Sequence, residues 1–347
     1  MVFPDRMGKK EIGRRLTQIN ADKESKDMQK QLIQPMVMTV TGPVEPDSLG
    51  LTDAHTHTWI EPVPGTQPGL PILNDQINIT AELIEFRESG GGCLVDCQPG
   101  GCGRNGRILR NLSQASGVHI VACTGFHLRQ YYPPDYWLYQ PTVSVDEAKA
   151  YFVEEITTGL RETQHLAQPV RAGFIKIACE ADIQDTPGHL IEAAALAAVE
   201  AGATIEVHTE KGADAEKIAQ RFERHGLSLN RLVLCHVDKR PYVGLHQELA
   251  QAGVTLEYDT FYRTKYEPEQ NVWPLLQKMV AAGLERQVVI ATDMAEAAMW
   301  SRLGGQPGQT AFTGQILPRL QTLGFKEKTI QHLMGGSIAR LLAFPIK

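Results

Sequence analysis

The chain has 347 residues, of which 42% are hydrophobic and 21% are charged. This length suits one large α/β domain, and the composition supplies enough apolar residues for its core. The formal net charge of −6 disfavours a nucleic-acid partner, because such binding needs a basic face. No apolar run approaches the ~20 residues that a membrane-spanning helix needs.

The first residues differ in composition from the rest. Residues 1–35 are charged and lack the apolar core of a secretory signal. We expect them to form a mobile or helical extension, and residues 36–347 to form one domain. Five of the six cysteines lie in apolar, strand-like runs, and none forms a CxxC pair. Free buried cysteines are typical of a reduced compartment, so we expect a cytoplasmic protein without a zinc ribbon.

From about residue 50 the chain alternates short apolar runs with amphipathic segments, which is the pattern of repeated βα units. The expected strands are 49–57, 93–98, 119–126, 171–178, 204–210, 231–238, 255–261 and 287–293. Runs that are apolar on both faces suit a parallel sheet covered by helices.

Helix signals separate these runs. Ser144 and Glu147 form a capping-box pattern, and Thr186-Pro187 opens a segment that Gly202 closes. Eight such units predict an α/β fold, a single (β/α)8 TIM barrel. A doubly wound open sheet has a similar strand count and stays as the alternative.

Polar residues stand at the C-terminal ends of the expected strands, where barrel enzymes build their active sites. They are His55, His57, His208, His236 and Asp293. Any one of these histidines is more often structural, and HxH by itself is a weak motif. Five metal-compatible residues at the same end of four strands predict a site for zinc or a similar divalent metal.

Lys176 lies in the apolar run AGFIKIACE, where an unpaired ammonium is costly. One interpretation is a lysine whose stem is packed and whose head reaches water. A protonated lysine cannot ligate a metal, because its nitrogen has no lone pair. A neutral lysine can react with carbon dioxide, and the carbamate that forms presents two oxygens able to bridge two metal ions.

The segments TDAHTH, AGFIKIA, EVHTE, LCHVD and ATDM occur in this order. On these segments the sequence resembles the phosphotriesterase-related branch of the amidohydrolase superfamily, from about residue 36 to the C-terminus. It departs from the family pattern in having HTH where many relatives have HEH, and GGSIARLL where they have an Asn-Pro stretch.

The resemblance implies a binuclear metal site with a shared hydroxide. His55, His57 and Asp293 would hold the buried metal, and His208 and His236 the exposed one. N6-carboxylated Lys176 would bridge the two divalent ions, for which zinc is expected and manganese, cobalt or iron are alternatives. Lys176 and Asp293 are the predicted catalytic residues, with Asp293 taking the proton of the nucleophile.

The segment GGCGRNG contains the GxGxxG spacing of a dinucleotide site, at Gly101, Gly103 and Gly106. The dinucleotide interpretation also needs an acidic residue about 20 positions later, and GFHLRQ stands there instead. We therefore expect a tight loop whose helix start, with Arg104 and Asn105, caps the barrel mouth.

Loop residues should select the substrate. The predicted substrate-binding residues are Trp59, Tyr131, Tyr132, Arg263 and Trp300. Several are aromatic, which suggests a partly apolar pocket. The segment MAEAAMW after the last strand lacks the basic residues that a phosphorylated substrate favours. We expect a small-molecule lactone or carboxyl ester, with promiscuous phosphotriesterase activity, no nucleic-acid or membrane partner, and a homodimer as a possible assembly.

Other functions stay open. An organophosphate hydrolase is one alternative, and a non-catalytic ligand-binding barrel is another. A TatD-like nuclease would need a glutamate at Lys176 and a basic mouth, and a mononuclear deaminase has no use for a bridging lysine.

Overall fold

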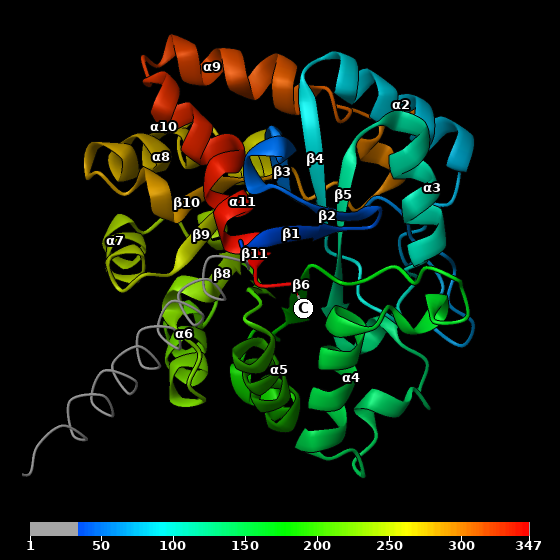
Figure 1. Cartoon of the computed structure of the whole chain (residues 1–347). Helices are drawn as coiled ribbons and strands as arrows, with labels where there is room; N and C mark the ends of the chain where they lie inside the picture. Colours follow the sequence, from blue (N-terminus) through cyan, green and yellow to red (C-terminus); the bar gives the residue numbers. More distant parts are fainter. Residues whose placement is uncertain (1–33, 347) are drawn as a thin grey trace, which may run out of the picture.

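A computed structural model describes residues 34–346 of the chain (Figure 1). Its main sheet has eight parallel strands in the order β10-β9-β8-β7-β6-β5-β4-β3. They are β3 (Leu51–Thr56), β4 (Gly91–Asp96), β5 (His119–Gly125), β6 (Phe174–Ala178), β7 (Ile205–His208), β8 (Leu232–Cys235), β9 (Thr255–Tyr258) and β10 (Val288–Ile290). Every strand neighbours the next one along the chain, as in a barrel.

Residues just after β10 close the ring against β3. The Asp293 amide donates to the His55 carbonyl at 2.9 Å, and the Thr292 amide donates to Asp53 Oδ1 at 3.0 Å. The predicted (β/α)8 barrel is therefore confirmed, and the open-sheet alternative is wrong.

Helices surround the barrel (Figure 1). They are α2 (Gln76–Glu88), α3 (Gly106–Ser116), α4 (Val145–Thr157), α5 (Gly188–Ala201), α6 (Ala215–Arg224), α7 (Val243–Gln251), α8 (Val272–Ala281), α9 (Leu317–Thr322), α10 (Glu327–Gln331) and α11 (Ser337–Leu342). The predicted capping box of Ser144 and Glu147 is present at the start of α4. Gly202 ends α5 in the left-handed conformation, at φ 71°.

A second, three-stranded sheet covers the N-terminal end of the barrel. It pairs β1 (Met36–Thr39) with both β2 (Gly42–Val44) and β11 (Ala343–Phe344). Just after β1, the Val40 amide donates to the Ile120 carbonyl of β5 at 2.9 Å. This end is packed, which leaves the C-terminal ends of the strands for a site.

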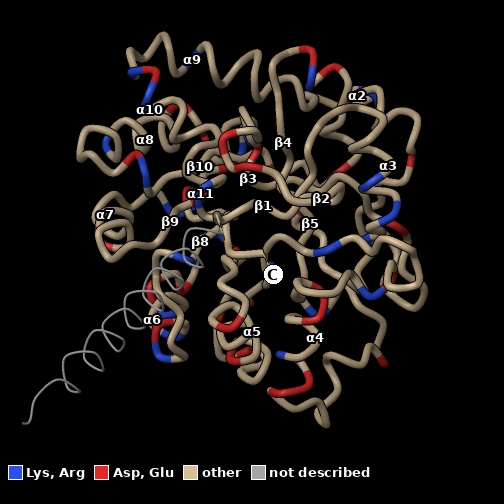
Figure 2. Tube along the Cα trace, viewed as in Figure 1, with Lys and Arg blue, Asp and Glu red and all other residues tan. Residues whose placement is uncertain are grey.

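The outer surface has charges of both signs. Lysines, arginines, aspartates and glutamates are scattered over the outer helices (Figure 2). Among residues 34–346, no helix combines the length and the apolarity that crossing a bilayer requires. The extension predicted over residues 1–35 lies almost wholly outside the described residues.

Candidate active site

The barrel brings the predicted metal ligands together. His55 lies on β3 and His57 follows it, while His208 ends β7. The rings of His55 and His57 have centroids 5.4 Å apart, those of His55 and His236 5.0 Å, and those of His208 and His236 4.6 Å. Residues from strands far apart in sequence therefore share one site at the C-terminal end of the barrel.

Two of these residues have unusual backbones. His236 directly follows β8 at φ 65°, and Asp293 follows β10 at φ 50°. Non-glycine residues seldom adopt this left-handed conformation, which costs on the order of 1–3 kcal/mol and is concentrated at functional sites. The predicted strands 231–238 and 287–293 are too long for this reason: the ligands lie on the turns that end the strands.

One group of donors has the geometry of a metal site. Nε2 of His55 and Nε2 of His57 lie 3.7 and 3.9 Å from Asp293 Oδ1. These separations are too long for hydrogen bonds. Two ligands at zinc bond lengths in a tetrahedral site lie about 3.4 Å apart. These separations therefore match two ligands of one metal ion better than they match a direct hydrogen bond.

A second side of the site offers two more imidazoles. Nε2 of His208 is buried and makes no hydrogen bond within the described residues, and Glu210 Oε2 lies 3.5 Å away. His236, Asp259 and Asp293 also place one donor atom each within 4.8 Å of one another. A buried nitrogen without a partner is costly unless a ligand satisfies it.

Three acceptors orient the histidines. His57 Nδ1 lies 2.6 Å from Gln98 Oε1, and His55 Nδ1 lies 2.9 Å from Glu257 Oε1. His236 Nδ1 donates to Asp259. Each bond fixes the ring, and a proton on Nδ1 leaves the lone pair of Nε2 for a metal.

These acceptors were not predicted from the sequence. Glu257 was the visible signal, since it is a carboxylate inside the apolar strand TLEYDTF. Burial lowers the pKa of His57 to about 4, and it lowers the pKa of His55 and His236 well below the ordinary value. The rings are therefore neutral at pH 7, which is the form that binds metals.

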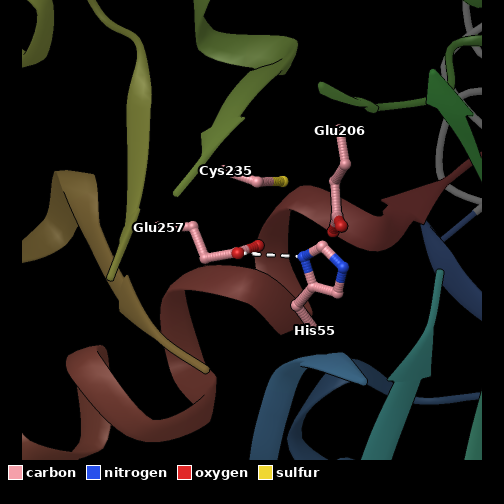
Figure 3. Close-up of side chains that lie close together, drawn as sticks. All are labelled: His55, Glu206, Cys235 and Glu257. Carbon is pink, nitrogen blue, oxygen red and sulfur yellow. Dashed lines mark hydrogen bonds and ion pairs between the residues drawn. The ribbon is translucent and has the colours of Figure 1, made fainter. Parts of the chain in front are cut away.

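Lys176 lies on β6 among acidic and thiol groups. His55, Glu206, Cys235 and Glu257 point toward one another from different strands (Figure 3). The Lys176 Nζ is 3.3 Å from Cys235 Sγ and 3.4 Å from His55 Nδ1. Glu206 Oε1 and Glu257 Oε2 are buried without a hydrogen bond in the described part of the chain. The alternative of a lysine reaching water is wrong, because Lys176 is 1% exposed.

The charge of Lys176 follows from these neighbours. Burial by itself lowers the pKa of Lys176, but Cys235, Cys97, Glu257 and Glu206 together hold this pKa well above its ordinary value. Burial also raises the pKa of both thiols and of both carboxylates, that of Glu206 to about 7. The charge of Lys176 therefore depends on which of these neighbours gives up a proton.

Asp293 is held by Arg263. Arg263 Nη2 donates to Asp293 Oδ2 at 2.8 Å and to its carbonyl oxygen at 2.7 Å. Burial favours the neutral acid, but His236 and Arg263 outweigh burial and hold the pKa of Asp293 below its ordinary value. Asp293 is therefore ionised at pH 7, and Oδ1 stays directed at His55 and His57.

A cavity of about 370 Å³ adjoins these ligands. Its walls near the ligands are His57, Gln98, Cys102, His127, Tyr131, His208 and Asp293. The outer wall comes from the loop over residues 60–72, which the sequence did not single out.

Of the predicted substrate-binding residues, Tyr131 lines this cavity. Trp300 is buried and donates to the Met294 carbonyl, and Tyr132 is also buried. Trp59 donates to Glu61, and Arg263 contacts Asp293.

The GGCGRNG segment forms the expected tight loop and helix start. Gly103 has φ 104°, and a Cβ there would lie 2.6 Å from the Glu61 carbonyl oxygen. Asn105 caps α3 by accepting from the Ile108 amide. Arg104 is buried and pairs with Glu155 and Glu162, so it points into the protein rather than toward a ligand.

Buried imidazoles and a carboxylate around a cation-sized space, beside a cavity at the C-terminal end of a (β/α)8 barrel, define the class of metal-dependent barrel hydrolases. The chain belongs to the phosphotriesterase family, whose model matches residues 35–341. It is therefore a hydrolase of this family.

Relatives with assigned activities cover nearly the whole chain. The sequence is 26% identical to a phospho-furanose lactonase of Mycoplasmopsis synoviae, over 89% of this chain and 92% of that protein. It is also 26% identical to an N-acetyltaurine hydrolase of Salmo salar, over 89% of this chain and 98% of that protein.

Solved structures support the fold. A lactonase from Listeria monocytogenes aligns with a TM-score of 0.80 at 23% identity, over 90% of this chain and all of that chain. An amidohydrolase from Mycoplasma synoviae aligns with a TM-score of 0.81 at 24% identity, over 90% of this chain and 92% of that chain.

Proposed function

We propose that this protein is a binuclear metal hydrolase that opens the ester bond of a lactone or a carboxyl ester. The observation that supports it most directly is the convergence of His55 Nε2, His57 Nε2 and Asp293 Oδ1 beside a substrate-sized cavity. The names of the relatives include ester and amide hydrolases, which use related chemistry.

Two divalent ions, zinc by preference, complete the proposed site. His55, His57 and Asp293 would hold one ion, and His208 and His236 the other, with N6-carboxylated Lys176 between them. When bound, such ions polarise a carbonyl oxygen and make a water molecule nucleophilic at neutral pH. Manganese, cobalt or iron would suit the same donors.

Asp293 would act as the general base. It is ionised at neutral pH, and Arg263 occupies its Oδ2 with a 2.8 Å hydrogen bond. With Oδ1 as the metal ligand, Oδ2 is the oxygen that would receive the proton of the attacking water, and Arg263 fixes its position.

The cavity favours an uncharged substrate. Within residues 34–346, the residues that line it include no lysine or arginine. Its outer wall is largely apolar, with Ile60, Pro62, Val63, Leu70 and Pro71. Two cationic groups adjoin the site, but Arg263 Nη2 and Lys239 Nζ face the Asp293 carboxylate, at 2.8 and 4.0 Å from Oδ2. We therefore propose neutral lactones or esters rather than phosphorylated ones.

The test combines metal analysis with substrate profiling. After reconstitution with zinc and bicarbonate, we expect about two equivalents of zinc per chain. We expect kcat/KM for neutral lactones or aryl esters to exceed that for a dialkyl aryl phosphate and for a phosphorylated lactone by more than about tenfold, or ~1.4 kcal/mol.

We expect His55→Ala to lose bound zinc and activity. His165→Ala is its matched control and should keep both, because His165 is exposed. Absence of bound metal in the reconstituted wild type would contradict the proposal. Metal binding without hydrolysis of any member of the panel would support a ligand-binding barrel instead. A tenfold preference for the phosphate triester would make organophosphate hydrolysis the main activity.

The cytoplasmic location and the homodimer stay predictions. The six cysteines are free and buried, as a reduced compartment would allow.

A further inference from the structure

His127 is an unassigned imidazole in the cavity wall. It follows β5, and its ring centroid lies 5.6 Å from that of His208 and 6.3 Å from that of His57. It thus faces ligands proposed for both metal ions. Two residues earlier, Gly125 lets β5 pack closely against β6, because a Cβ there would lie 1.8 Å from the Lys176 carbonyl oxygen.

The hydrogen bond at Nδ1 fixes the tautomer of His127. The Leu128 amide donates to His127 Nδ1 at 2.8 Å, so this nitrogen accepts and carries no proton. In a neutral imidazole the proton is then on Nε2. This is opposite to His55, His57 and His236, whose Nδ1 atoms face carboxylate or amide oxygens.

This tautomer gives His127 a different role from the proposed ligands. With Nε2 protonated and the lone pair of Nδ1 occupied, neither nitrogen has a lone pair for a metal. Nε2 makes no hydrogen bond within residues 34–346, and the residue lines the cavity. Its N–H is therefore a donor offered to whatever enters the cavity.

The loop over residues 128–139 holds His127 in place. The Tyr132 hydroxyl accepts from the His127 amide at 2.9 Å, and the Tyr139 hydroxyl donates to the His127 carbonyl. The Tyr131 ring packs edge-on against the imidazole, with centroids 4.4 Å apart. A donor held this firmly loses little entropy when it binds a substrate.

We propose that the Nε2–H of His127 donates a hydrogen bond to an oxygen of the ester group of the substrate, and so positions that group between the two proposed metal ions. This role rests on the proposed function. It makes His127 a fixed neutral donor rather than a fifth histidine ligand.

The kinetic test compares His127→Phe with His127→Gln. Phenylalanine keeps a ring but removes the donor, whereas glutamine keeps an N–H donor. We expect His127→Phe to lower kcat/KM for the best lactone by about tenfold or more. We expect His127→Gln to be less impaired than His127→Phe. Expressed as the logarithm of kcat/KM, its loss should be at most about two thirds of the loss in His127→Phe. The zinc content of both should match that of the wild type.

His165→Phe is the matched control at an exposed histidine. The donor role is overturned if His127→Phe keeps wild-type kcat/KM. It is also overturned if both variants lose activity equally, because the ring would then act by packing. Loss of zinc from His127→Phe would make His127 a ligand and overturn the proposal as well.

A spectroscopic test does not depend on turnover. In the full chain labelled with 15N-histidine, the His127 signals can be assigned by their loss in His127→Phe. We expect the Nε2–H tautomer with and without zinc, whereas an Nδ1–H tautomer overturns the proposal. If the wild type hydrolyses no ester, the proposed function fails, and this spectrum still decides whether His127 is the donor described.

Discussion

In the proposed site, Lys176 is the residue that would let the two metal ions share a ligand. It is buried at the middle of β6, and its Nζ lies within 3.5 Å of both His55 nitrogens. Lys176 is the only lysine among the proposed site residues, and so the only one that a carbamate could convert into an anionic bridge.

Lys176→Ala should lose metal and activity together. Even changes outside the ligand shell commonly cost about 10–100-fold in metal affinity or activity, so removing the bridge should cost at least as much. Zinc content by mass spectrometry and kcat/KM for the best lactone are the measurements. Short carboxylic acids should partly restore both, because they can supply a bridging carboxylate.

Lys326→Ala is the matched control, since Lys326 is exposed near α10. Full activity and full zinc content in Lys176→Ala would exclude a bridging role.

Asp293 is both a proposed ligand and the proposed base. Asp293→Asn keeps the shape and one oxygen donor but loses the basic oxygen. We expect kcat to fall by about 10²–10⁴-fold, and much more than zinc content falls. If zinc is lost while the reconstituted variant regains wild-type kcat, Asp293 is a ligand only.

The pH dependence should reflect the same residue. The pKa of Asp293 lies below its ordinary value, so the basic form persists through neutral pH and is lost as pH falls through that lowered pKa. Protonation of Asp293 should therefore not limit kcat/KM until the pH falls below the ordinary pKa of aspartate.

At the scale of elements, the Gly-rich loop and α3 support the cavity wall. Asn105 caps α3 and also donates to Glu61 Oε1 at 2.7 Å, which ties this helix to the loop over residues 60–72. The loop with a nucleotide-like spacing thus has a structural role in fixing the active-site rim.

Asn105→Ala should lower the free energy of unfolding by about 1–2 kcal/mol, because it removes a helix cap. Denaturant titration measures this change. Asn105→Ser should keep a helix cap but lose the amide donor to Glu61, so it should raise KM with a smaller loss of stability than Asn105→Ala. An alanine variant as stable as the wild type would show that the cap contributes nothing.

At the scale of the whole molecule, a buried ion-pair network joins separate βα units. Arg104 follows β4 and contacts Glu155 on α4 at 2.5 Å and Glu162 at 2.7 Å. Its Nη1 also donates to the Cys123 carbonyl of β5 at 2.6 Å. One side chain therefore fixes the β4–α3 unit to the β5–α4 unit and to the connection that follows α4.

Arg104→Met should destabilise the protein by about 3–5 kcal/mol, because it leaves Glu155 buried without its partner. The free energy of unfolding of Arg104→Lys should lie between those of Arg104→Met and the wild type, because lysine keeps the charge but cannot form bidentate hydrogen bonds. Urea unfolding is the measurement, and a change below about 1 kcal/mol in Arg104→Met would contradict the prediction.

The network also predicts a pH effect. Burial raises the pKa of Glu162, but Arg104 outweighs burial and holds this pKa below its ordinary value. Its contribution to stability is present above the unfolded pKa and is lost as pH falls through the folded one. The Arg104→Met variant should therefore lose less stability on acidification than the wild type.

The sequence by itself determined the barrel and the candidate ligands. Strand and helix periods are local properties, because neighbouring residues decide which face of an element is apolar. His55, His57, Lys176, His208 and Asp293 stood out because they interrupt or end such apolar runs.

The tertiary structure decided how those residues are held and what lies beside them. His55 meets Glu257 across 202 positions of sequence, and His57 meets Gln98 across 41. Such pairs form only when the barrel closes and brings different strand ends to one place.

The walls of the cavity also come together only when the barrel closes. Trp300 was expected at the mouth, but its ring is buried and its Nε1 donates to the Met294 carbonyl. The loop over residues 60–72 forms the wall instead. The direction of a loop and the rotamers of its side chains depend on contacts with other units, which local sequence patterns do not specify.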